Sequence, residues 1–181
     1  AFEYAKKKGR DKVTLVHKAN ILKFTCGLFM EVGEEVAKDY PEIEYEDLIV
    51  DNMAMQMVMK PEQFDVIVTT NLFGDILSDL ASGLVGGLGL TGAANIGDDA
   101  AMFEAVHGSA PDIAGQNKAN PVAFLLSALM MLEHIEEDEL ADRIRQAVYL
   151  TLEDKSVCTP DIGGSGTTES FTKAVCKHLQ V

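Results

Sequence analysis

The first forty residues carry two successive patterns of apolar positions, a strand pattern and then a helical one. Residues 13–17 (VTLVH) are short, β-branched and apolar, which is typical of a buried strand. Between Ile21 and Tyr40 the apolar residues recur at helical spacing, and Pro41 then ends the predicted helix. The recurring positions are Leu22, Leu28, Phe29, Val32 and Val36.

The following segments predict two further strands with a helix between them. A short strand ends at Ile49 and Val50, and residues 51–59 (DNMAMQMVM) form a Met-rich helix closed by Pro61. The methionines favour core packing over a cofactor site, because Met fills irregular gaps in a core. Residues 66–70 (VIVTT) are predicted to be the third strand.

The rest of the chain begins with a helix and a glycine-rich passage. Residues 71–85 have one apolar helix face, and glycines are frequent from residue 83 to residue 97. A strand over residues 102–106 and a loop over residues 107–120 come next. Three more helices are predicted to begin near Pro121, Asp138 and Thr168. Because strands and helices alternate, the chain is predicted to belong to the α/β class.

Charge and composition exclude several kinds of partner. The 181 residues include 15 basic and 29 acidic side chains, and the net charge of −14 argues against nucleic acid. No apolar run approaches the roughly 20 residues that a bilayer span needs, and residues 1–10 lack the apolar core of a signal peptide. Cys26, Cys158 and Cys176 have no metal-ligand spacing, which favours free thiols. We therefore expect a cytoplasmic protein without membrane partners.

The glycine-rich passage contains the spacing of a dinucleotide fingerprint. Gly87, Gly89 and Gly92 match G-x-G-x-x-G, which in a Rossmann fold follows a strand and opens a helix. Here the preceding residues are helical and the following ones are not a convincing helix. We therefore expect these glycines to permit tight backbone turns, and the fold not to be a Rossmann fold.

Asp75 and Asp79 are the strongest chemical signal in the residues themselves. Positions i and i+4 lie on one helix face, where two carboxylates repel each other unless a cation lies between them. Oxygen ligands of this kind suit Mg²⁺ or Mn²⁺. The alternative is a favourable charge near the helix start and a solvated acid. Lys18, directly after the first strand, is either a functional amine or a surface charge.

Four segments together resemble a known family of enzymes. They are HKANILK (17–23), NLFGDILSDLASGLVGGLG (71–89), EAVHGSAPDIAGQNKANP (104–121) and TPDIGGSGTTESF (159–171). The chain resembles, almost end to end, the isocitrate, homoisocitrate and 3-isopropylmalate dehydrogenases. These enzymes oxidise a 2-hydroxy acid that carries a carboxylate on the neighbouring carbon, and the product then loses CO₂.

The resemblance implies a metal site and a catalytic lysine. Asp75 and Asp79 would hold Mg²⁺ or Mn²⁺, joined by Asp51 from the partner subunit of a homodimer with a shared active site. A cation of this kind stabilises the charge that develops during decarboxylation. Lys18 would be the general acid/base, with Asp51 as the second catalytic residue. Asn20 would lie close to the nicotinamide and the substrate.

The resemblance also implies NAD as the cofactor, bound by the loop of residues 107–120. The residues expected to line the adenine pocket are His107, Gly108, Ala110 and Asn120. Asp112 would accept hydrogen bonds from the ribose diol, with Ile113 packed beside it. NADP-dependent relatives carry Lys-Tyr at these two positions, and a carboxylate at Asp112 would repel a ribose phosphate.

The family fold has two lobes, of which this chain would hold a part. Residues 1–85 would belong to the small, dimer-forming lobe that carries Lys18 and the metal aspartates. Residues 86–181 would be the C-terminal part of the large lobe, with the loop for the adenosine half of NAD. The family's substrate-binding arginines and catalytic tyrosine lie N-terminal to these residues, and the chain starts without a methionine. We therefore expect a fragment that is inactive alone.

The substrate and the class of subunit rest on smaller differences. HKANILK (17–23), Thr25, GLF (27–29) and IVDN (49–52) resemble isocitrate or homoisocitrate enzymes more than 3-isopropylmalate ones. QNKANP (116–121) favours isocitrate, an intermediate of the tricarboxylic acid cycle. A non-catalytic regulatory subunit or a dimerising scaffold are the alternatives. The presence of all three aspartates, which regulatory subunits tend to lose, disfavours the regulatory alternative.

Overall fold

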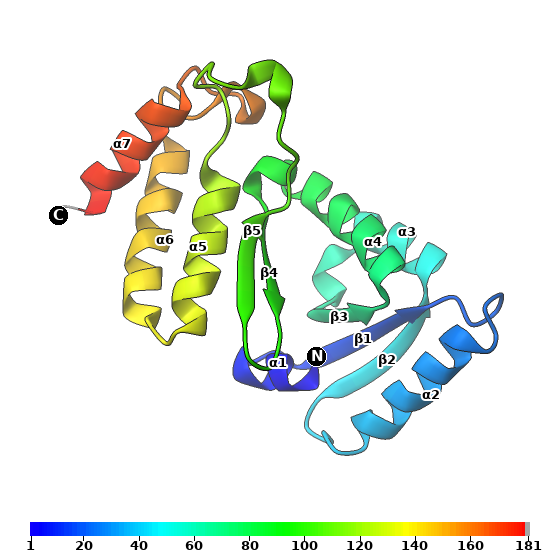
Figure 1. Ribbon diagram of the computed structural model, residues 1–181. Coiled ribbons are helices and arrows are strands. Elements are labelled where there is room, and N and C mark those ends of the chain that lie inside the picture. The colour runs from blue at the N-terminus through cyan, green and yellow to red at the C-terminus, as the bar shows by residue number, and fades with distance from the viewer. Residues whose placement is uncertain (180–181) are drawn as a thin grey trace. The chain divides into compact units, whose positions relative to one another are not determined.

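Strand β1 (Lys12–His17) lies at the centre of a three-stranded parallel sheet, between β2 (Glu44–Ile49) and β3 (Val66–Thr69) (Figure 1). This computed structural model describes residues 1–179 of the chain. The last five residues of β1 are all buried, as expected for a parallel strand that is covered on both faces. The strand predicted over residues 13–17 is therefore confirmed.

Helices cover both faces of this sheet. They are α1 (Phe2–Lys7), α2 (Thr25–Ala37), α3 (Val50–Met59) and α4 (Asn71–Leu84), with a 3₁₀ turn over Pro61–Gln63. Successive side chains of a strand point to opposite faces, and two separate apolar clusters result. Val13 packs with Phe2 on one face, whereas Val16 packs with Met53 and Leu77 on the other. The sheet and its helices form one compact unit, Ala1–Leu84.

Two predicted boundaries in this unit are wrong. Helix α2 begins at Thr25 and not at Ile21, because the chain first makes a turn in which the amides of Ile21 and Leu22 donate to the carbonyl of Lys18. Val50 belongs to α3 and not to the preceding strand, because the chain passes directly from β2 into the helix.

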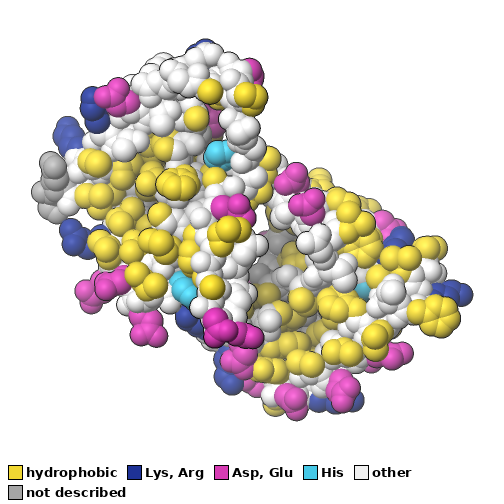
Figure 2. All heavy atoms as spheres, in the orientation of Figure 1, with side chains coloured by type: hydrophobic (Ala, Val, Ile, Leu, Met, Phe, Trp, Pro, Cys, Tyr) yellow, Lys and Arg dark blue, Asp and Glu magenta, His cyan; other side chains and the backbone are white. Residues whose placement is uncertain are grey.

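The apolar positions that indicated α2 do not face the core of this unit. The side chains of Leu22, Leu28, Val32 and Val36 are exposed, and Cys26 is the residue of α2 that is buried. The helical spacing therefore identified the helix correctly, but it did not identify a buried face. Hydrophobic side chains are visible on the surface in the space-filling view (Figure 2).

The second unit, Val85–Val181, pairs an antiparallel hairpin with three helices. The hairpin is formed by β4 (Gly92–Ile96) and β5 (Ala101–Ala105), and the helices are α5 (Val122–His134), α6 (Asp138–Glu153) and α7 (Thr168–Leu179). The core cluster includes Val122, Val148 and Phe171. All three helices were predicted near these starting points.

Strand β4 was missed by the sequence analysis because its first residue is a glycine. A Cβ atom at Gly92 would lie 2.8 Å from the backbone nitrogen of Ser127 in α5, so the glycine permits a close approach of strand and helix. The hydroxyl of Ser127 donates to the carbonyl of Glu104 at 2.6 Å and accepts from the amide of Ala93 at 3.2 Å. This serine therefore ties α5 to both strands of the hairpin.

The G-x-G-x-x-G spacing lies between a helix and a strand. Gly87, Gly89 and Gly92 follow α4, enclose a 3₁₀ turn at Leu88–Leu90, and lead into β4. A dinucleotide fingerprint has the opposite context, because it follows a strand and opens a helix. The prediction that the fold is α/β and not a Rossmann fold is confirmed.

The state of the cysteines and the lengths of the helices agree with what the sequence predicted. Cys26, Cys158 and Cys176 are free thiols, the first two buried and the third exposed. Within residues 1–179, no helix combines the length and apolar character that crossing a membrane would require. Acidic side chains are scattered over the visible face and do not gather in one patch (Figure 2).

Candidate active site

Lys18 and Asp51 meet where two parallel strands end. Lys18 follows β1, and Asp51 stands in the first turn of α3 directly after β2. Because His17 and Ile49 are register partners in these strands, the residues after them emerge at the same edge of the sheet. Lys18 Nζ donates to Asp51 Oδ1 at 2.5 Å. The two predicted catalytic residues, 33 positions apart in the sequence, are thus in direct contact.

The lysine changes the electrostatics of its partner. The hydrogen bond from Lys18, together with a backbone hydrogen bond, lowers the pKa of the Asp51 carboxyl below its ordinary value. The Asp51 side chain is 69% exposed and that of Lys18 is 24% exposed. The Asp51 carboxyl therefore favours its charged form, and the pair remains accessible to a substrate or a cation.

Asp75 and Asp79 lie one turn apart on the outer face of α4. Leu77, between them in sequence, is buried, whereas both aspartates are exposed, as expected for positions i and i+4 on a face opposite the core. The hydroxyl of Ser78 donates to the backbone carbonyl of Asp75 at 3.1 Å. Within residues 1–179 neither carboxylate has a hydrogen-bonding or ionic partner.

The three aspartates do not form a metal site within one chain. In the part of the chain that the structure describes, no group of three His, Cys, Asp or Glu side chains is placed to share a metal ion. The donor set itself fits a hard cation, because Asp51, Asp75 and Asp79 supply only carboxylate oxygens.

Asn20 lies in the turn after β1, two residues beyond Lys18. Its side chain is exposed, and the turn around it is held by the amides of Ile21 and Leu22, which donate to the carbonyl of Lys18 at 3.0 and 2.8 Å. Asn20 is thus close to Lys18 in the sequence and open to solvent. Its contact with a nicotinamide stays a prediction.

A cavity of about 610 Å³ lies in the second unit, within the usual size range of small-molecule sites. Much of its lining comes from the loop of residues 107–120. Of the residues predicted to bind the cofactor, the cavity wall contains His107, Gly108, Ala110, Ile113 and Asn120. Asp112 is exposed and is not part of the wall, although Ile113 beside it is.

Asn120 is held by the protein itself. Its Nδ2 atom donates to Asp161 Oδ2 at 2.9 Å, and its Oδ1 atom accepts from the amide of Val122 at 3.0 Å. A Cβ atom at Gly89 would lie 3.1 Å from that same oxygen of Asp161. A side chain at Gly89 would therefore require Asp161 to shift by a few tenths of an ångström. Asn120 positions the start of α5, and these two bonds leave one Nδ2 hydrogen and one lone pair of Oδ1.

The backbone of the cavity loop adopts unusual conformations. Ala110 has φ 41° and Asn117 has φ 58°, in the left-handed region that side chains other than Asn and Asp seldom adopt. His107 Nδ1 lies 2.9 Å from the carbonyl oxygen of Gly108. Since a carbonyl only accepts, Nδ1 carries a hydrogen and donates it to Gly108. Strain of this kind is common at ligand sites.

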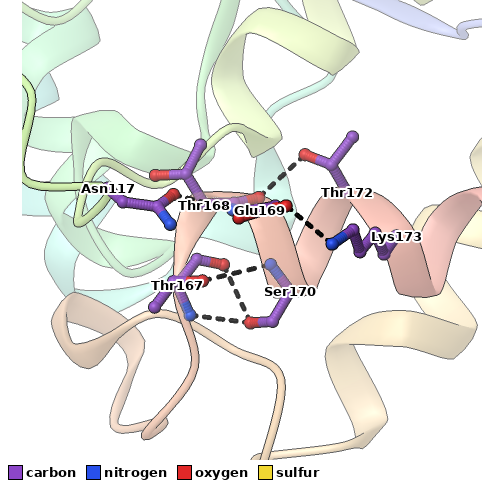
Figure 3. Close-up of polar contacts among 7 residues, drawn as sticks. All are labelled: Asn117, Thr167, Thr168, Glu169, Ser170, Thr172 and Lys173. Atoms are coloured by element: carbon purple, nitrogen blue, oxygen red, sulfur yellow. Dashed lines mark hydrogen bonds and ion pairs between the residues drawn. The ribbon is translucent and has the colours of Figure 1, made fainter.

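Helix α7 secures this loop through its first turn (Figure 3). The carbonyl oxygen of Asn117 accepts from the amide of Thr168 at 3.1 Å, and Asn117 Oδ1 accepts from the amide of Glu169 at 2.9 Å. The hydroxyl of Thr168 donates to the carbonyl of Ala119 at 2.5 Å. The first amides of a helix lack intrahelical partners, so the loop and the helix satisfy each other.

The remaining amides of that turn are satisfied within the helix start. The amide of Thr167 donates to Ser170 Oγ at 2.7 Å, and the amide of Ser170 donates to Thr167 Oγ1 at 3.1 Å (Figure 3). This reciprocal pair is a capping box with serine at the fourth position. It fixes where α7 begins, and therefore where Thr168 meets the cavity.

The C-terminal wall of the cavity was missed by the sequence analysis. Pro160, Asp161 and Thr168 line it, and all three lie within residues 159–171. That segment belonged to the resemblance, but no role was assigned to it. The signal available was its content of glycine, threonine and serine, which favours turns and helix caps, and this signal does not say which loop the segment contacts.

Comparison with known proteins places this chain in a family. Residues 1–175 match the model of the isocitrate/isopropylmalate dehydrogenase family, and the chain belongs to that family. It is 58% identical over 180 residues to the isocitrate/homoisocitrate dehydrogenase of Thermus thermophilus, covering 99% of this chain and 54% of that protein. It is 56% identical to the mitochondrial isocitrate dehydrogenase [NAD] catalytic subunit 5 of Arabidopsis thaliana, covering 99% and 48%.

A solved structure shares the fold. The crystal structure of isocitrate dehydrogenase from Methylococcus capsulatus matches with a TM-score of 0.96 and 58% identity, over 99% of this chain and 54% of that one. The fold is therefore that of the isocitrate dehydrogenases, as the sequence predicted. The chain spans about half the length of the curated relatives it matches.

Proposed function

We propose that the protein carrying this chain is a β-decarboxylating dehydrogenase that converts isocitrate to 2-oxoglutarate with reduction of NAD, in the presence of Mg²⁺ or Mn²⁺. The observation that carries the proposal is the 2.5 Å contact between Lys18 Nζ and Asp51 Oδ1 at the carboxyl edge of the sheet. A proton donor paired with a carboxylate at an accessible strand end suits acid/base chemistry on a small acid. Membership of the family supports the reaction class.

Lys18 would supply the proton that the product needs after CO₂ is lost. The hydrogen bond to Asp51 aims the amine, so that Nζ would donate a proton to the carbon from which CO₂ departed. Asp51, Asp75 and Asp79 would hold the cation, which when bound supplies positive charge beside the oxygen where negative charge develops. Lys18 and Asp51 lie on one chain, so both would come from one subunit of a homodimer and the other two aspartates from its partner.

The cavity of the second unit would receive the adenosine half of NAD. Its volume of about 610 Å³ and its location at the predicted loop support this assignment. Asp112 is exposed beside the wall, where its carboxylate would accept from the ribose diol and repel a ribose phosphate. The first unit would form the small, dimer-forming lobe and the second unit the C-terminal part of the large lobe.

Other substrates and another class of subunit are the competing functions. The Thermus thermophilus relative is named for both isocitrate and homoisocitrate, and the family name includes isopropylmalate. A non-catalytic regulatory subunit would have no use for Asp75 and Asp79. The cytoplasm stays the predicted compartment, whereas the Arabidopsis thaliana relative is named as mitochondrial.

Steady-state kinetics of the complete protein test the proposal. We expect kcat/KM to be highest for isocitrate among isocitrate, homoisocitrate and 3-isopropylmalate, and higher with NAD than with NADP. Lys18→Met should abolish turnover while saturable binding of Mn²⁺ persists, because the metal ligands remain. Full turnover of Lys18→Met would contradict the assigned chemistry, and faster reduction of NADP than of NAD would contradict the assigned cofactor.

A further inference from the structure

His17 is a buried polar residue beside the candidate catalytic lysine. It is the last residue of β1 and it is 4% exposed. By the alternation of a strand, its side chain shares a sheet face with Val13 and Leu15. Burial of an imidazole is costly unless its two nitrogens find partners, so the partners of His17 indicate what the ring does.

Each ring nitrogen of His17 has one partner. The amide of Ala19 donates to Nδ1 at 3.0 Å, and Nε2 lies 2.8 Å from Asp47 Oδ2. A nitrogen that accepts a hydrogen bond carries no hydrogen, so the single hydrogen of the neutral ring is on Nε2. Nε2–H therefore donates to Asp47, and the ring has one tautomer and one orientation.

Asp47 reaches the ring from the neighbouring strand. It pairs with Leu15 in the parallel register of β1 and β2, so its side chain is diagonal to His17 on the same face. Its side chain is 42% exposed, and that of His17 is 5% exposed. The carboxylate therefore stays solvated while it holds the buried ring from one side.

These bonds fix the backbone on both sides of Lys18. On its C-terminal side, the amide of Ala19 is bound to the His17 ring. The carbonyl of Lys18 itself accepts from the amides of Ile21 and Leu22. The direction in which the Lys18 side chain leaves the backbone is thus set before Nζ meets Asp51.

We propose that His17 and Asp47 are positioning residues that set the direction of Lys18 toward the reacting carbon. The pair acts through the bond from the Ala19 amide to Nδ1, which Asp47 secures by fixing the tautomer. This inference rests on the proposed function, because it assigns a catalytic consequence to a turn geometry. A misplacement of about 1 Å in a catalytic group can reduce a rate on the order of 100-fold, so a turn of this kind has a measurable effect.

Two substitutions at His17 separate the two ring bonds. In His17→Asn, the side-chain oxygen occupies the place of Nδ1 and can accept from the amide two residues later, as in an Asx turn. In His17→Gln, the side-chain nitrogen can donate to Asp47 as Nε2 does, but no acceptor is left near Ala19. Both variants bury an amide of similar polarity, so a general loss of stability affects both.

The experiment measures kcat, KM and amide exchange in the complete protein. We expect His17→Gln to lower kcat roughly 10- to 100-fold with KM for NAD and for the acid within about threefold of wild type, and His17→Asn to retain kcat within about threefold. Hydrogen exchange at the Ala19 amide should be fast in His17→Gln and slow in wild type and His17→Asn. Asp47→Asn, which keeps an acceptor for Nε2–H, should resemble wild type, whereas Asp47→Ala, which removes the acceptor, should lower kcat as His17→Gln does.

Two results would overturn the inference. One is a kcat of His17→Gln equal to that of His17→Asn. The other is equal protection of the Ala19 amide from hydrogen exchange in both variants. This measurement does not depend on turnover. Lys18→Met distinguishes failure of this inference from failure of the proposed function. If Lys18→Met loses turnover while His17→Gln keeps it, the proposed role of Lys18 stands and the positioning role of His17 does not.

Discussion

An exposed lysine–aspartate contact orients its members more than it stabilises the fold. Ion pairs at the surface contribute little to stability, because water and salt screen them, and Asp51 is mostly exposed. The same contact still changes the titration of the carboxyl, since the hydrogen bond from Lys18 favours its charged form. The contact therefore lowers the pKa of Asp51 and fixes the direction of both side chains at the edge of the sheet.

Two substitutions should change the pKa values of two carboxyl groups independently of each other. The pKa of Asp51 is lowered by Lys18, and the pKa of Asp154 is lowered by hydrogen bonds from the hydroxyl and amide of Ser156. In metal-free protein, Lys18→Met should raise the pKa of Asp51 and leave that of Asp154 low, whereas Ser156→Ala should do the reverse. Carboxyl carbon shifts followed by NMR during a pH titration measure both.

The sign of the linked stability change follows from the lowered pKa values. A carboxyl whose pKa is lower in the folded state adds stability above its unfolded pKa of about 3.9, and this is lost as pH falls through the folded pKa. Lys18→Met should therefore reduce stability at neutral pH more than at acidic pH. A pKa of Asp51 that does not change in Lys18→Met would show that another group lowers it.

At the scale of elements, the first turn of α7 depends on a distant loop. Asn117 supplies both its carbonyl and its side-chain oxygen to that turn, in a left-handed conformation. Asn117→Ala should lower the free energy of unfolding by about 1–2 kcal/mol, because it removes a helix cap and places alanine at positive φ. Urea denaturation measures the change.

Two control variants identify which property of Asn117 matters. Asn117→Asp keeps a side-chain acceptor for the amide of Glu169, so its free energy of unfolding should fall least among the three variants. Asn117→Gly keeps the favourable backbone conformation but loses the acceptor, so its stability should fall between those of the Asp and Ala variants. Equal stability of Asn117→Ala and wild type would contradict the capping role.

The segment after α6 folds back so closely that it needs glycine. A Cβ atom at Gly164 would lie 2.0 Å from the carbonyl oxygen of Cys158, whereas one at Gly27 in α2 would meet nothing within 4 Å. Gly164→Ala should therefore destabilise the protein by about 1–3 kcal/mol through overpacking against backbone. Gly27→Ala should stabilise it by about 0.5–1 kcal/mol through helix propensity. Thermal unfolding of the two variants compares them, and equal melting temperatures would refute the clash.

At the scale of the whole molecule, the chain holds two units and spans about half of its relatives. We predict from the resemblance that the family's substrate-binding arginines and catalytic tyrosine lie outside this sequence. We expect the isolated 181-residue chain to produce no NADH from isocitrate, NAD and Mn²⁺, because cations are needed to bind a tricarboxylate. Absorbance at the NADH band measures this, with the complete protein as the positive control. Steady NADH production by the isolated chain would refute the expectation.

The local pattern of apolar residues was sufficient to predict most helices and strands. It failed where a particular residue is fixed by a contact outside its own element. Residues 13–17 and the starts of the last three helices were predicted, because buried strands and helix caps have short-range signatures. The start of α2 was wrong, because the carbonyl of Lys18 accepts two amides in a turn that apolar spacing does not reveal. Strand β4 was missed, because glycine is untypical of strands. The reason for Gly92 is its close approach to Ser127 in α5, which is distant in the sequence.

The sequence by itself determined the class of fold, the family, and which side chains are available for chemistry. Only the tertiary structure decided which of them meet: Lys18 with Asp51 across 33 positions, and Asn120 with Asp161 across 41. The periodicity of apolar residues is a local property of a helix or strand. Contacts between distant residues depend on strand register and on the packing of whole elements, so neither pair, nor the ring of His17 behind Lys18, could be inferred from spacing.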